Sequence, residues 1–181
     1  GGGGADSMVG GEENNQYTVD HAGDTVIGGS GQDTVVSTVD LDLRQVQFQG
    51  VDQVELTGAE ADQAWGDEAS NTLVGSAGAD TLDGGLGVDS LAGGTGPDSL
   101  FGGEDNASDY LSGGAHNDTL RGGPGADDMA GGSGDDLYFI DDVSDYVYDL
   151  SGANDKIVST VSVNLDEHVG VEHVDLIASV D

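Results

Sequence analysis

The stretch Gly84-Gly-Leu-Gly-Val-Asp89-Ser-Leu91-Ala is followed at once by Gly93-Gly-Thr-Gly-Pro-Asp98-Ser-Leu100-Phe. The same nine-residue pattern, Gly-Gly-x-Gly-x-Asp-x-U-x with U a large apolar residue, recurs over residues 66–139. Its register shifts once, at residues 102–112, where two extra residues precede the aspartate. A fixed short period is typical of solenoids, in which each repeat stacks on its neighbours and cannot bury its apolar side chain alone.

This pattern resembles the calcium-binding nonapeptide repeats of the RTX (repeats-in-toxin) family. The resemblance implies an all-β fold, a right-handed parallel β-roll (a β-solenoid), and it implies roughly six to nine bound Ca²⁺ ions. It also implies a secreted bacterial protein, extracellular or displayed on the cell surface, of the kind exported unfolded by type I secretion. These properties are expectations for the structure to test.

The composition of the repeat suits calcium on chemical grounds. Glycine at the first, second and fourth positions permits positive φ and lets backbone carbonyls approach one another. Aspartate at the sixth position adds a carboxylate to the same loop. Carbonyls and carboxylates are hard oxygen donors that calcium accepts at six- to eightfold coordination, whereas magnesium demands a tighter octahedron.

Two units form one coil of about eighteen residues, so every second unit stacks on the same side, and an ion can lie between stacked loops. The expected carboxylate ligands are Asp6, Asp24, Asp33, Asp80, Asp89, Asp98, Asp109, Asp118, Asp127, Asp136 and Asp145. Asn15 and Asn71 occupy the same position and would ligate through their amide oxygens. The expected stacked pairs are 6 with 24, 15 with 33, 71 with 89, 80 with 98, 89 with 109, 98 with 118, 109 with 127, 118 with 136 and 127 with 145.

Backbone oxygens of the loops complete the predicted ligand set. They belong to Gly75, Ala77, Gly78, Gly84, Gly85, Leu86, Gly87, Gly93, Gly94, Thr95, Gly96, Gly113, Gly114, Gly122, Gly123 and Gly125. The apolar eighth positions are expected to face inward as two stacked rows. They are Leu73, Leu82, Leu91, Leu100, Leu111, Leu120, Met129, Tyr138 and Val147.

The charge balance makes the fold dependent on cations. Thirty-six acidic residues face three basic ones, for a formal net charge of −33 in 181 residues. Such a chain repels itself and is poor in core-forming residues, so we expect folding and calcium binding to be one event. The same charge argues against nucleic acid and anionic membranes as direct partners. There is no cysteine, and no apolar run is long enough to span a membrane.

Four segments are predicted from the glycine content. Residues 1–36 form a first nonapeptide block, 37–65 a glycine-poor strand segment, 66–148 the main block and 149–181 a second glycine-poor strand segment. Strand is expected around Val39–Leu43, Val46–Phe48 and Val54–Leu56, where apolar residues alternate with polar ones. Residues 155–161 mirror 33–39, and residues 171–176 mirror 51–56, so the last segment duplicates 33–58. The chain starts within a repeat, which predicts a fragment of a longer protein.

Other functions have weaker support. No cysteine nucleophile, His-Glu-x-x-His helix or Gly-x-Ser-x-Gly elbow is present, so no catalytic site is predicted. A carbohydrate-binding or adhesive module remains an alternative, with Trp65 as a candidate for sugar stacking. So does the non-catalytic part of a secreted hydrolase or epimerase. His168 and His173 could hold zinc, although surface imidazoles fit them better, and His116 is expected to replace a loop glycine at positive φ.

Overall fold

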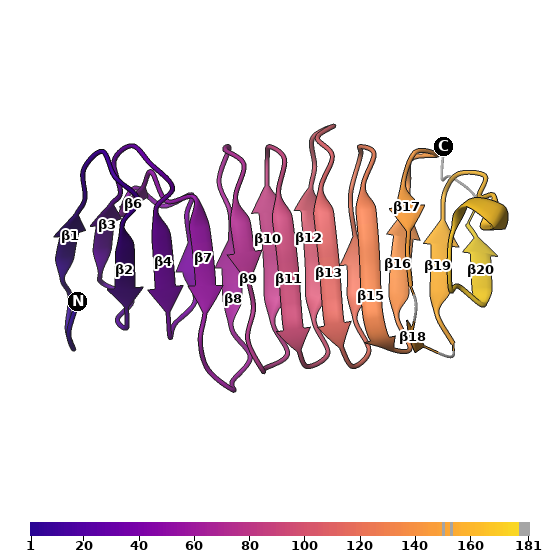
Figure 1. Cartoon of the computed structure of the whole chain (residues 1–181), viewed down its shortest axis with the longest axis horizontal. Helices are drawn as coiled ribbons and strands as arrows, with labels where there is room; N and C mark the ends of the chain where they lie inside the picture. The colour runs from indigo at the N-terminus through magenta and orange to yellow at the C-terminus, as the bar shows by residue number, and fades with distance from the viewer. Residues whose placement is uncertain (150, 153, 178–181) are drawn as a thin grey trace.

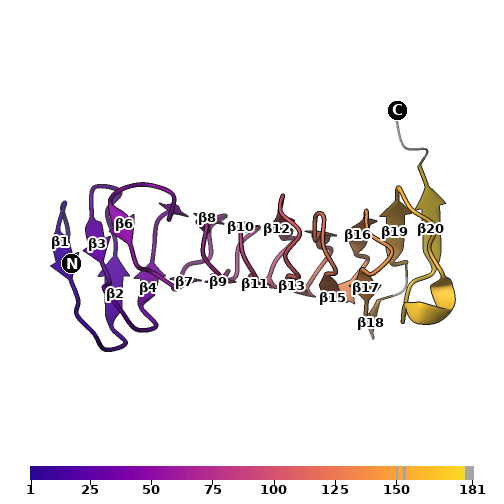
Figure 2. The ribbon, with the colours of Figure 1, turned by 90° about the horizontal axis from the view of Figure 1, so that it is seen from above.

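The computed structural model describes residues 1–149, 151–152 and 154–177. It is a parallel β-roll, as predicted, in which short strands stack side by side along one axis (Figure 1). The first and last described strands, β1 (Ser7–Val9) and β20 (His173–Leu176), lie at opposite ends of the stack, as Figure 2 shows from a perpendicular direction. The only described helix is a 3₁₀ turn, η1 (Leu165–Glu167), near the C-terminal end. Among the described residues, no helix is long and apolar enough to cross a membrane.

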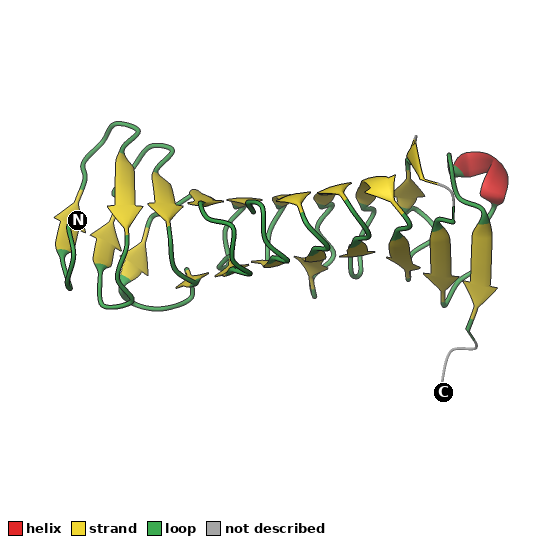
Figure 3. Cartoon of the chain, turned by 90° about the horizontal axis from the view of Figure 1, so that it is seen from below, coloured by secondary structure: helices red, strands yellow, loops and turns green. Residues whose placement is uncertain are grey.

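The strands form two facing rows, which Figure 3 shows joined by loops. One row is a nine-stranded sheet of β2 (Gln16–Val19), β4 (Thr34–Ser37), β7 (Gln53–Leu56), β9 (Thr72–Val74), β11 (Ser90–Thr95), β13 (Tyr110–Ala115), β15 (Asp128–Gly134), β17 (Tyr146–Val147) and β18 (Ser151–Gly152). The other row contains an eight-stranded sheet of β5 (Leu41–Asp42), β8 (Gln63–Trp65), β10 (Thr81–Gly85), β12 (Ser99–Gly103), β14 (Thr119–Arg121), β16 (Leu137–Ile140), β19 (Lys156–Ser159) and β20 (His173–Leu176). It also contains a three-stranded sheet of β1 (Ser7–Val9), β3 (Thr25–Ile27) and β6 (Phe48–Gln49).

The strand register follows the nine-residue period. Leu82 pairs with Leu100, eighteen residues on, and Leu73 pairs with Leu91 on the opposite sheet. The two extra residues in 102–112 lengthen one coil, so that Leu91 pairs with Leu111. All described strand pairs are parallel, because each coil returns the chain to the same side in the same direction.

The core consists of the predicted apolar rows. Every eighth-position side chain from Leu73 to Val147 is at most 1% exposed. The rows continue into the glycine-poor segments with Val35 and Val54 at one end and Ile157 at the other. Ala64 also lies in a row and is fully buried, so residues 57–65 already belong to a regular coil.

The strands expected around Val39–Leu43 and Val46–Phe48 are wrong for Val39, Leu43 and Val46, which lie outside β5 and β6. Residues 43–47 form a turn between β5 and β6, and Val46 is 89% exposed. The reason is topological: one coil supplies both β5, which pairs with β8, and β6, which pairs with β3. The chain must therefore turn between them, and the strand row on this side is divided into two sheets.

The second glycine-poor segment folds like the first. In both copies a serine hydroxyl, of Ser37 or Ser159, donates to the carbonyl two residues on, of Val39 or Val161. In both, the strand pairs in parallel with the next one, β4 with β7 and β19 with β20. The predicted four-part division of the chain remains a prediction about domain organisation.

Replacing Leu100 by alanine should destabilise the calcium-loaded protein, because Leu100 is 1% exposed within a stacked row. We expect a loss of about 2–5 kcal/mol in unfolding free energy, from lost burial and the cavity left behind. Thermal unfolding in excess calcium, followed by circular dichroism, measures it. Leu86→Ala is the matched control, since Leu86 is 42% exposed in a loop. Equal melting temperatures for the two variants would contradict the assignment of the core.

Candidate metal centre

One oxygen of each stacked aspartate binds the backbone of the preceding coil. The Asp80 N–H donates to Asp98 Oδ1 at 2.8 Å, and the Asp98 N–H donates to Asp118 Oδ1 at 2.8 Å. The same bond joins the two members of every stacked pair predicted from the sequence, at 2.7–3.2 Å. The structure therefore brings the predicted ligand residues together in columns along the roll.

The second oxygen is often left without a partner. Asp98 Oδ2 and Asp118 Oδ2 are buried and accept no hydrogen bond. Within the described chain, the buried Oδ2 atoms without a partner belong to Asp33, Asp89, Asp98, Asp118, Asp127, Asp136 and Asp155. A buried carboxylate oxygen without a donor is unfavourable by several kcal/mol, so these atoms call for a cation or a proton.

Each such oxygen faces a hollow that a side chain would fill. A Cβ built on Gly93 would lie 2.4 Å from Asp98 Oδ2 and 2.7 Å from the carbonyl oxygen of Gly113 in the next coil. A Cβ on Gly84 would meet Asp89 Oδ2 and the carbonyl oxygen of Gly102 in the same way. The first glycine of the repeat thus keeps open a space where a carboxylate and a carbonyl converge. Both are hard oxygen donors, so this space fits calcium.

In six of the seven loops with a free Oδ2, the second residue is a glycine at positive φ. In the loop of Asp98 this residue is Gly94, at φ +109°, and its N–H does not reach the carboxylate. The Gly93 carbonyl and the Gly94 N–H belong to one peptide, in which C=O and N–H point in opposite directions. Because the Gly93 carbonyl faces the preceding coil, the Gly94 N–H points away from that coil. Positive φ also occurs at the second glycines Gly29, Gly85, Gly114, Gly123 and Gly132.

Four loops that lack the second glycine, those of Asp24, Asn71, Asp80 and Asp145, close on themselves. The Ser76 N–H donates to Asp80 Oδ2 at 2.6 Å, and the Asp67 N–H donates to Asn71 Oδ1 at 2.8 Å. The second oxygens of Asp24 and Asp145 likewise accept from Asp20 and Asp141. These expected ligands occupy the predicted columns, but a backbone amide already satisfies the oxygen that would face an ion.

The remaining expected ligands fall into three groups. Asp6 Oδ2 accepts from the Gly2 N–H, and the Asn15 amide nitrogen donates to the Glu13 carbonyl. The carbonyls of Gly84, Gly93, Gly113 and Gly122 lie beside the hollows. Ligation through the carbonyl remains a prediction for Gly75, Ala77, Gly78, Gly85, Leu86, Gly87, Gly94, Thr95, Gly96, Gly114, Gly123 and Gly125.

Sequence reasoning missed several carboxylates of the same columns. Asp62 precedes Asp80 in its column, and Asp155 follows Asp136, each joined by the same amide-to-Oδ1 bond. Asp149 lies close to that column end and is 1% exposed. The equivalence of residues 155–161 with 33–39 could have identified Asp155, because Asp33 was among the predicted ligands.

The structure bears differently on His116, which was expected at positive φ, and on His168 and His173, which were considered as zinc ligands. His116 has φ +83°, the only described non-glycine residue with positive φ, as expected for its place in a loop. His168 Nδ1 accepts from the Val147 N–H at 3.2 Å, and His173 is exposed in β20. The one close group of potential metal-ligating side chains in the described chain contains neither His168 nor His173.

The buried aspartates resist ionisation in the protein without bound cations. Burial raises the pKa of Asp89, Asp118 and Asp127 from 3.8 to about 7, and the charges of neighbouring aspartates add to the rise. Burial also raises the pKa of Asp98, Asp136 and Asp145 to about 6. These carboxylates therefore favour either a bound proton or a bound cation within the fold.

A separate feature lies on the outer face of the eight-stranded sheet. The strand register places Trp65, Asp83, Phe101, Arg121 and Phe139 in one row across β8 to β16, so that aromatic rings alternate with charged groups. The Arg121 guanidinium lies over the Phe139 ring, 4.5 Å from its centroid. The row is partly exposed and lies outside the metal columns.

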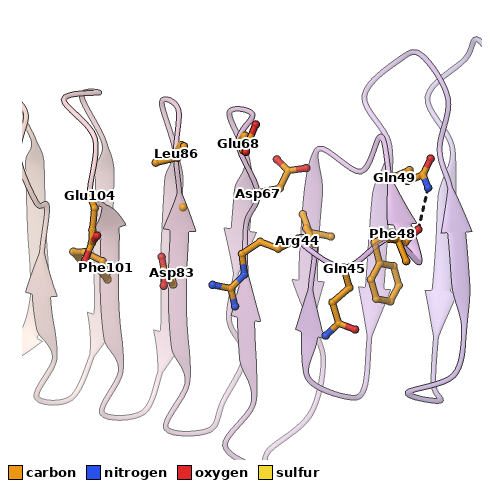
Figure 4. A pocket seen from close by; sticks show the side chains of 13 residues that line it. Arg44, Gln45, Phe48, Gln49, Asp67, Glu68, Asp83, Leu86, Phe101 and Glu104 are labelled. Atoms are coloured by element: carbon orange, nitrogen blue, oxygen red, sulfur yellow. Dashed lines mark hydrogen bonds between the residues drawn. The ribbon is translucent and has the colours of Figure 1, made fainter.

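A groove of about 850 Å³ adjoins this row near the turn between β5 and β6 (Figure 4). Arg44, Phe48, Asp83, Phe101 and Glu104 are among its lining residues. The Arg44 side chain extends along the groove, bonds Asp42 at 2.8 Å and lies over the Trp65 ring at 5.6 Å. Two of the three basic residues of the chain, Arg44 and Arg121, thus lie on this face.

Comparison with protein families gives one match. The sequence matches the RTX calcium-binding nonapeptide repeat (4 copies) over residues 1–17, 22–37, 56–91, 65–100, 84–106 and 105–138. These segments cover most of the chain and include both nonapeptide blocks. A search of curated proteins found no significant match.

Acid should stabilise the calcium-free fold. In the folded chain the pKa values of the buried aspartates lie near 6–7, above their ordinary 3.8, so protonation of these groups favours the folded state. This contribution to stability is fully present below about pH 4 and is lost as pH rises through about 6–7. Protein freed of calcium by chelation and dialysis should therefore show more strand signal in circular dichroism at about pH 5 than at pH 8. With saturating calcium the ions replace the protons and the difference should shrink. Strand signal that falls on acidification without calcium would contradict the assigned burial.

Proposed function

The chain belongs to the family of the RTX calcium-binding nonapeptide repeat, and on this basis we propose that it is a structural module whose folding is coupled to calcium. In this proposal the parent is a secreted or surface-displayed bacterial protein. An RTX β-roll is typically a non-catalytic structural module. Any catalytic activity of a parent protein, such as a secreted hydrolase or epimerase, then lies outside residues 1–181.

The observation that carries this proposal is the set of seven buried Oδ2 atoms that have no hydrogen-bond donor. Each lies beside a glycine hollow, and a carbonyl of the next coil faces the hollow in the loops of Asp89 and Asp98. A calcium ion there would satisfy the carboxylate and reduce the repulsion along the column. Without a cation, the column concentrates negative charge in a chain that already carries −33.

We assign the ions first to loops whose second residue is a glycine at positive φ. In those loops the carboxylate oxygen is free, as at Asp98 and Asp118. Loops such as that of Asp80 satisfy the oxygen with a backbone amide, so we assign them a weaker role or a capping role. Calcium would supply charge neutralisation and cross-linking between coils, which a thin apolar core does not supply alone.

The proposed location follows from calcium supply. Extracellular calcium modules commonly have dissociation constants of about 10⁻⁴–10⁻³ M. Sites of that affinity stay unfilled in a low-calcium cytosol and fill outside the cell. The chain would then remain unfolded before export, as type I secretion requires, and would fold after it.

Removing calcium should unfold the protein at neutral pH, because the columns then contain uncompensated buried carboxylates. Circular dichroism in a chelator should show a disordered chain, and adding calcium to the millimolar range should restore the strand signal. Magnesium at the same concentration is the control and should restore little. Strand signal that the chelator leaves unchanged at pH 8 would refute the coupling.

One variant tests the columns directly. Asp118→Asn keeps an oxygen for the Asp98 N–H but removes the charge beside the hollow. We expect the calcium concentration for half-maximal folding to rise about tenfold, equivalent to about 1.4 kcal/mol. Asp128→Asn is the control with the same charge change, since Asp128 is exposed on β15. If both variants folded at the same calcium concentration, the ions would not bind beside Asp118.

A second candidate function is carbohydrate binding on the outer face of the eight-stranded sheet. Trp65, Phe101 and Phe139 lie on alternate strands, so their rings are spaced by about 9.5 Å. Evenly spaced aromatic rings with charged groups between them suit the apolar faces and hydroxyls of an extended polysaccharide. The adjoining groove extends this face toward Arg44 (Figure 4).

Electrophoresis of the calcium-loaded protein through gels containing soluble polysaccharides tests this second function. We expect at least one polysaccharide to retard the protein, and Phe101→Ala to abolish the retardation by removing the central ring. Tyr110→Ala is the control, since Tyr110 is an exposed aromatic residue on the opposite sheet. Unretarded wild-type protein, or equal effects of the two substitutions, would exclude binding at this face.

A further inference from the structure

Three buried carboxylates meet at the end of the main repeat block. Asp136, Asp149 and Asp155 are 2%, 1% and 0% exposed. Each offers a carboxylate oxygen, and these oxygens lie within 4.8 Å of one another. No lysine or arginine forms an ion pair with any of them in the described chain. Three buried carboxylates in such proximity require compensation by a cation or by protons.

Two of the three carboxylates have an oxygen that no protein group satisfies. Asp136 Oδ2 and Asp155 Oδ2 are buried and have no hydrogen-bond partner. Asp149 is held in place instead, because its Oδ1 accepts from the Ser151 N–H and its Oδ2 accepts from the Tyr138 hydroxyl. The Tyr138 hydroxyl in turn accepts from the Gly131 N–H at 2.7 Å. The third carboxylate is thus positioned beside two oxygens that lack a partner.

The first copy of the duplicated unit provides an internal comparison. Tyr17 corresponds to Tyr138, 121 residues later, and Gly28 corresponds to Asp149 at the same spacing. In the first copy the Tyr17 hydroxyl donates to the Gly28 carbonyl oxygen at 3.4 Å, where Tyr138 donates to a carboxylate.

The charge differs between the copies as well as the contact. Asn15 stands in the first copy where Asp136 stands in the second, while Asp33 and Asp155 are both aspartates. The second copy therefore places three carboxylates where the first has one. The nonapeptide pattern does not account for Asp149, which occupies the place of a loop's first glycine.

We propose that Asp136, Asp149 and Asp155 form one cation site of three carboxylates at the C-terminal end of the main block, with calcium as the cation. The site rests on the proposed function, but it goes beyond it by assigning a ligand role to Asp149. Carboxylate oxygens are the ligands calcium prefers, and a third charge raises affinity over a two-carboxylate loop site. The ion would join the main block to the following strand β19, which begins at Lys156, directly after Asp155.

Ion counting by native mass spectrometry of the calcium-loaded full chain tests this site. Asp149→Asn keeps one acceptor oxygen, which the Ser151 N–H can still use, replaces the other oxygen with an amide NH₂ and removes the charge. We expect it to bind one calcium ion fewer at concentrations that saturate the wild type. Asp149→Gly introduces the residue found at this place in the first copy and should also bind one calcium ion fewer than the wild type. Asp135→Asn, an exposed neighbour with the same charge change, should bind as many ions as the wild type.

Terbium luminescence supplies a local readout. Tyr138 bonds Asp149 directly, so a terbium ion at this site should be sensitised by excitation of that tyrosine. We expect the tyrosine-excited emission to fall in Asp149→Asn and in Tyr138→Phe, and to persist in Asp135→Asn. Circular dichroism in calcium confirms that each variant is folded.

The outcomes separate this site from the proposed function. A chain that neither folds nor binds calcium refutes both. Calcium-dependent folding with the same ion count and terbium emission in Asp149→Asn as in the wild type refutes the site alone, and shows that the three carboxylates share protons instead. Loss of one ion in both Asp149 variants, with Asp135→Asn unchanged, supports the site.

Discussion

The structure depends on how each aspartate carboxylate divides its two oxygens between neighbouring coils. One oxygen accepts the backbone N–H of the preceding coil, as Asp98 does from Asp80. This bond aligns the carboxylates in columns, in coils of eighteen to twenty residues. The other oxygen is left beside a glycine hollow, where protein donors are absent. The bond that orders the stack therefore also creates the demand for a cation.

Glycine controls this division at two positions of the loop. The first glycine leaves room for the carboxylate oxygen and a carbonyl from the next coil, as at Gly93. The second glycine adopts positive φ, and its N–H points away from the carboxylate, as at Gly94. Where serine replaces it, at Ser76, the amide binds the carboxylate of its own loop. The amide of Gly2, which does not have positive φ, likewise binds Asp6, so the backbone conformation of this residue separates a loop with a free carboxylate oxygen from a closed one.

The apolar rows and the charged columns act together. The rows bury one large side chain per unit, with Leu82 and Leu100 fully enclosed, but the loops on either side contain little apolar surface. Stability then depends on the columns, in which burial raises the carboxylate pKa values to about 6–7 when no cation is bound. A module of this kind can be unfolded where calcium is scarce and folded where it is abundant.

The sequence alone determined the period, the parallel coil, the inward rows and nine stacked pairs of ligand residues, because all of these follow from the regular spacing along the chain. It did not reveal the turn at Val46, since alternation predicts a strand and only the pairing of β5 and β6 with different sheets requires a turn. Nor did it distinguish loops with a free carboxylate oxygen from closed ones, which depends on peptide orientation at Gly94 or Ser76. The cluster around Asp149 also came only from the tertiary structure, because Asp149 does not stand at the aspartate position of a repeat and only the folded chain brings it close to Asp136 and Asp155.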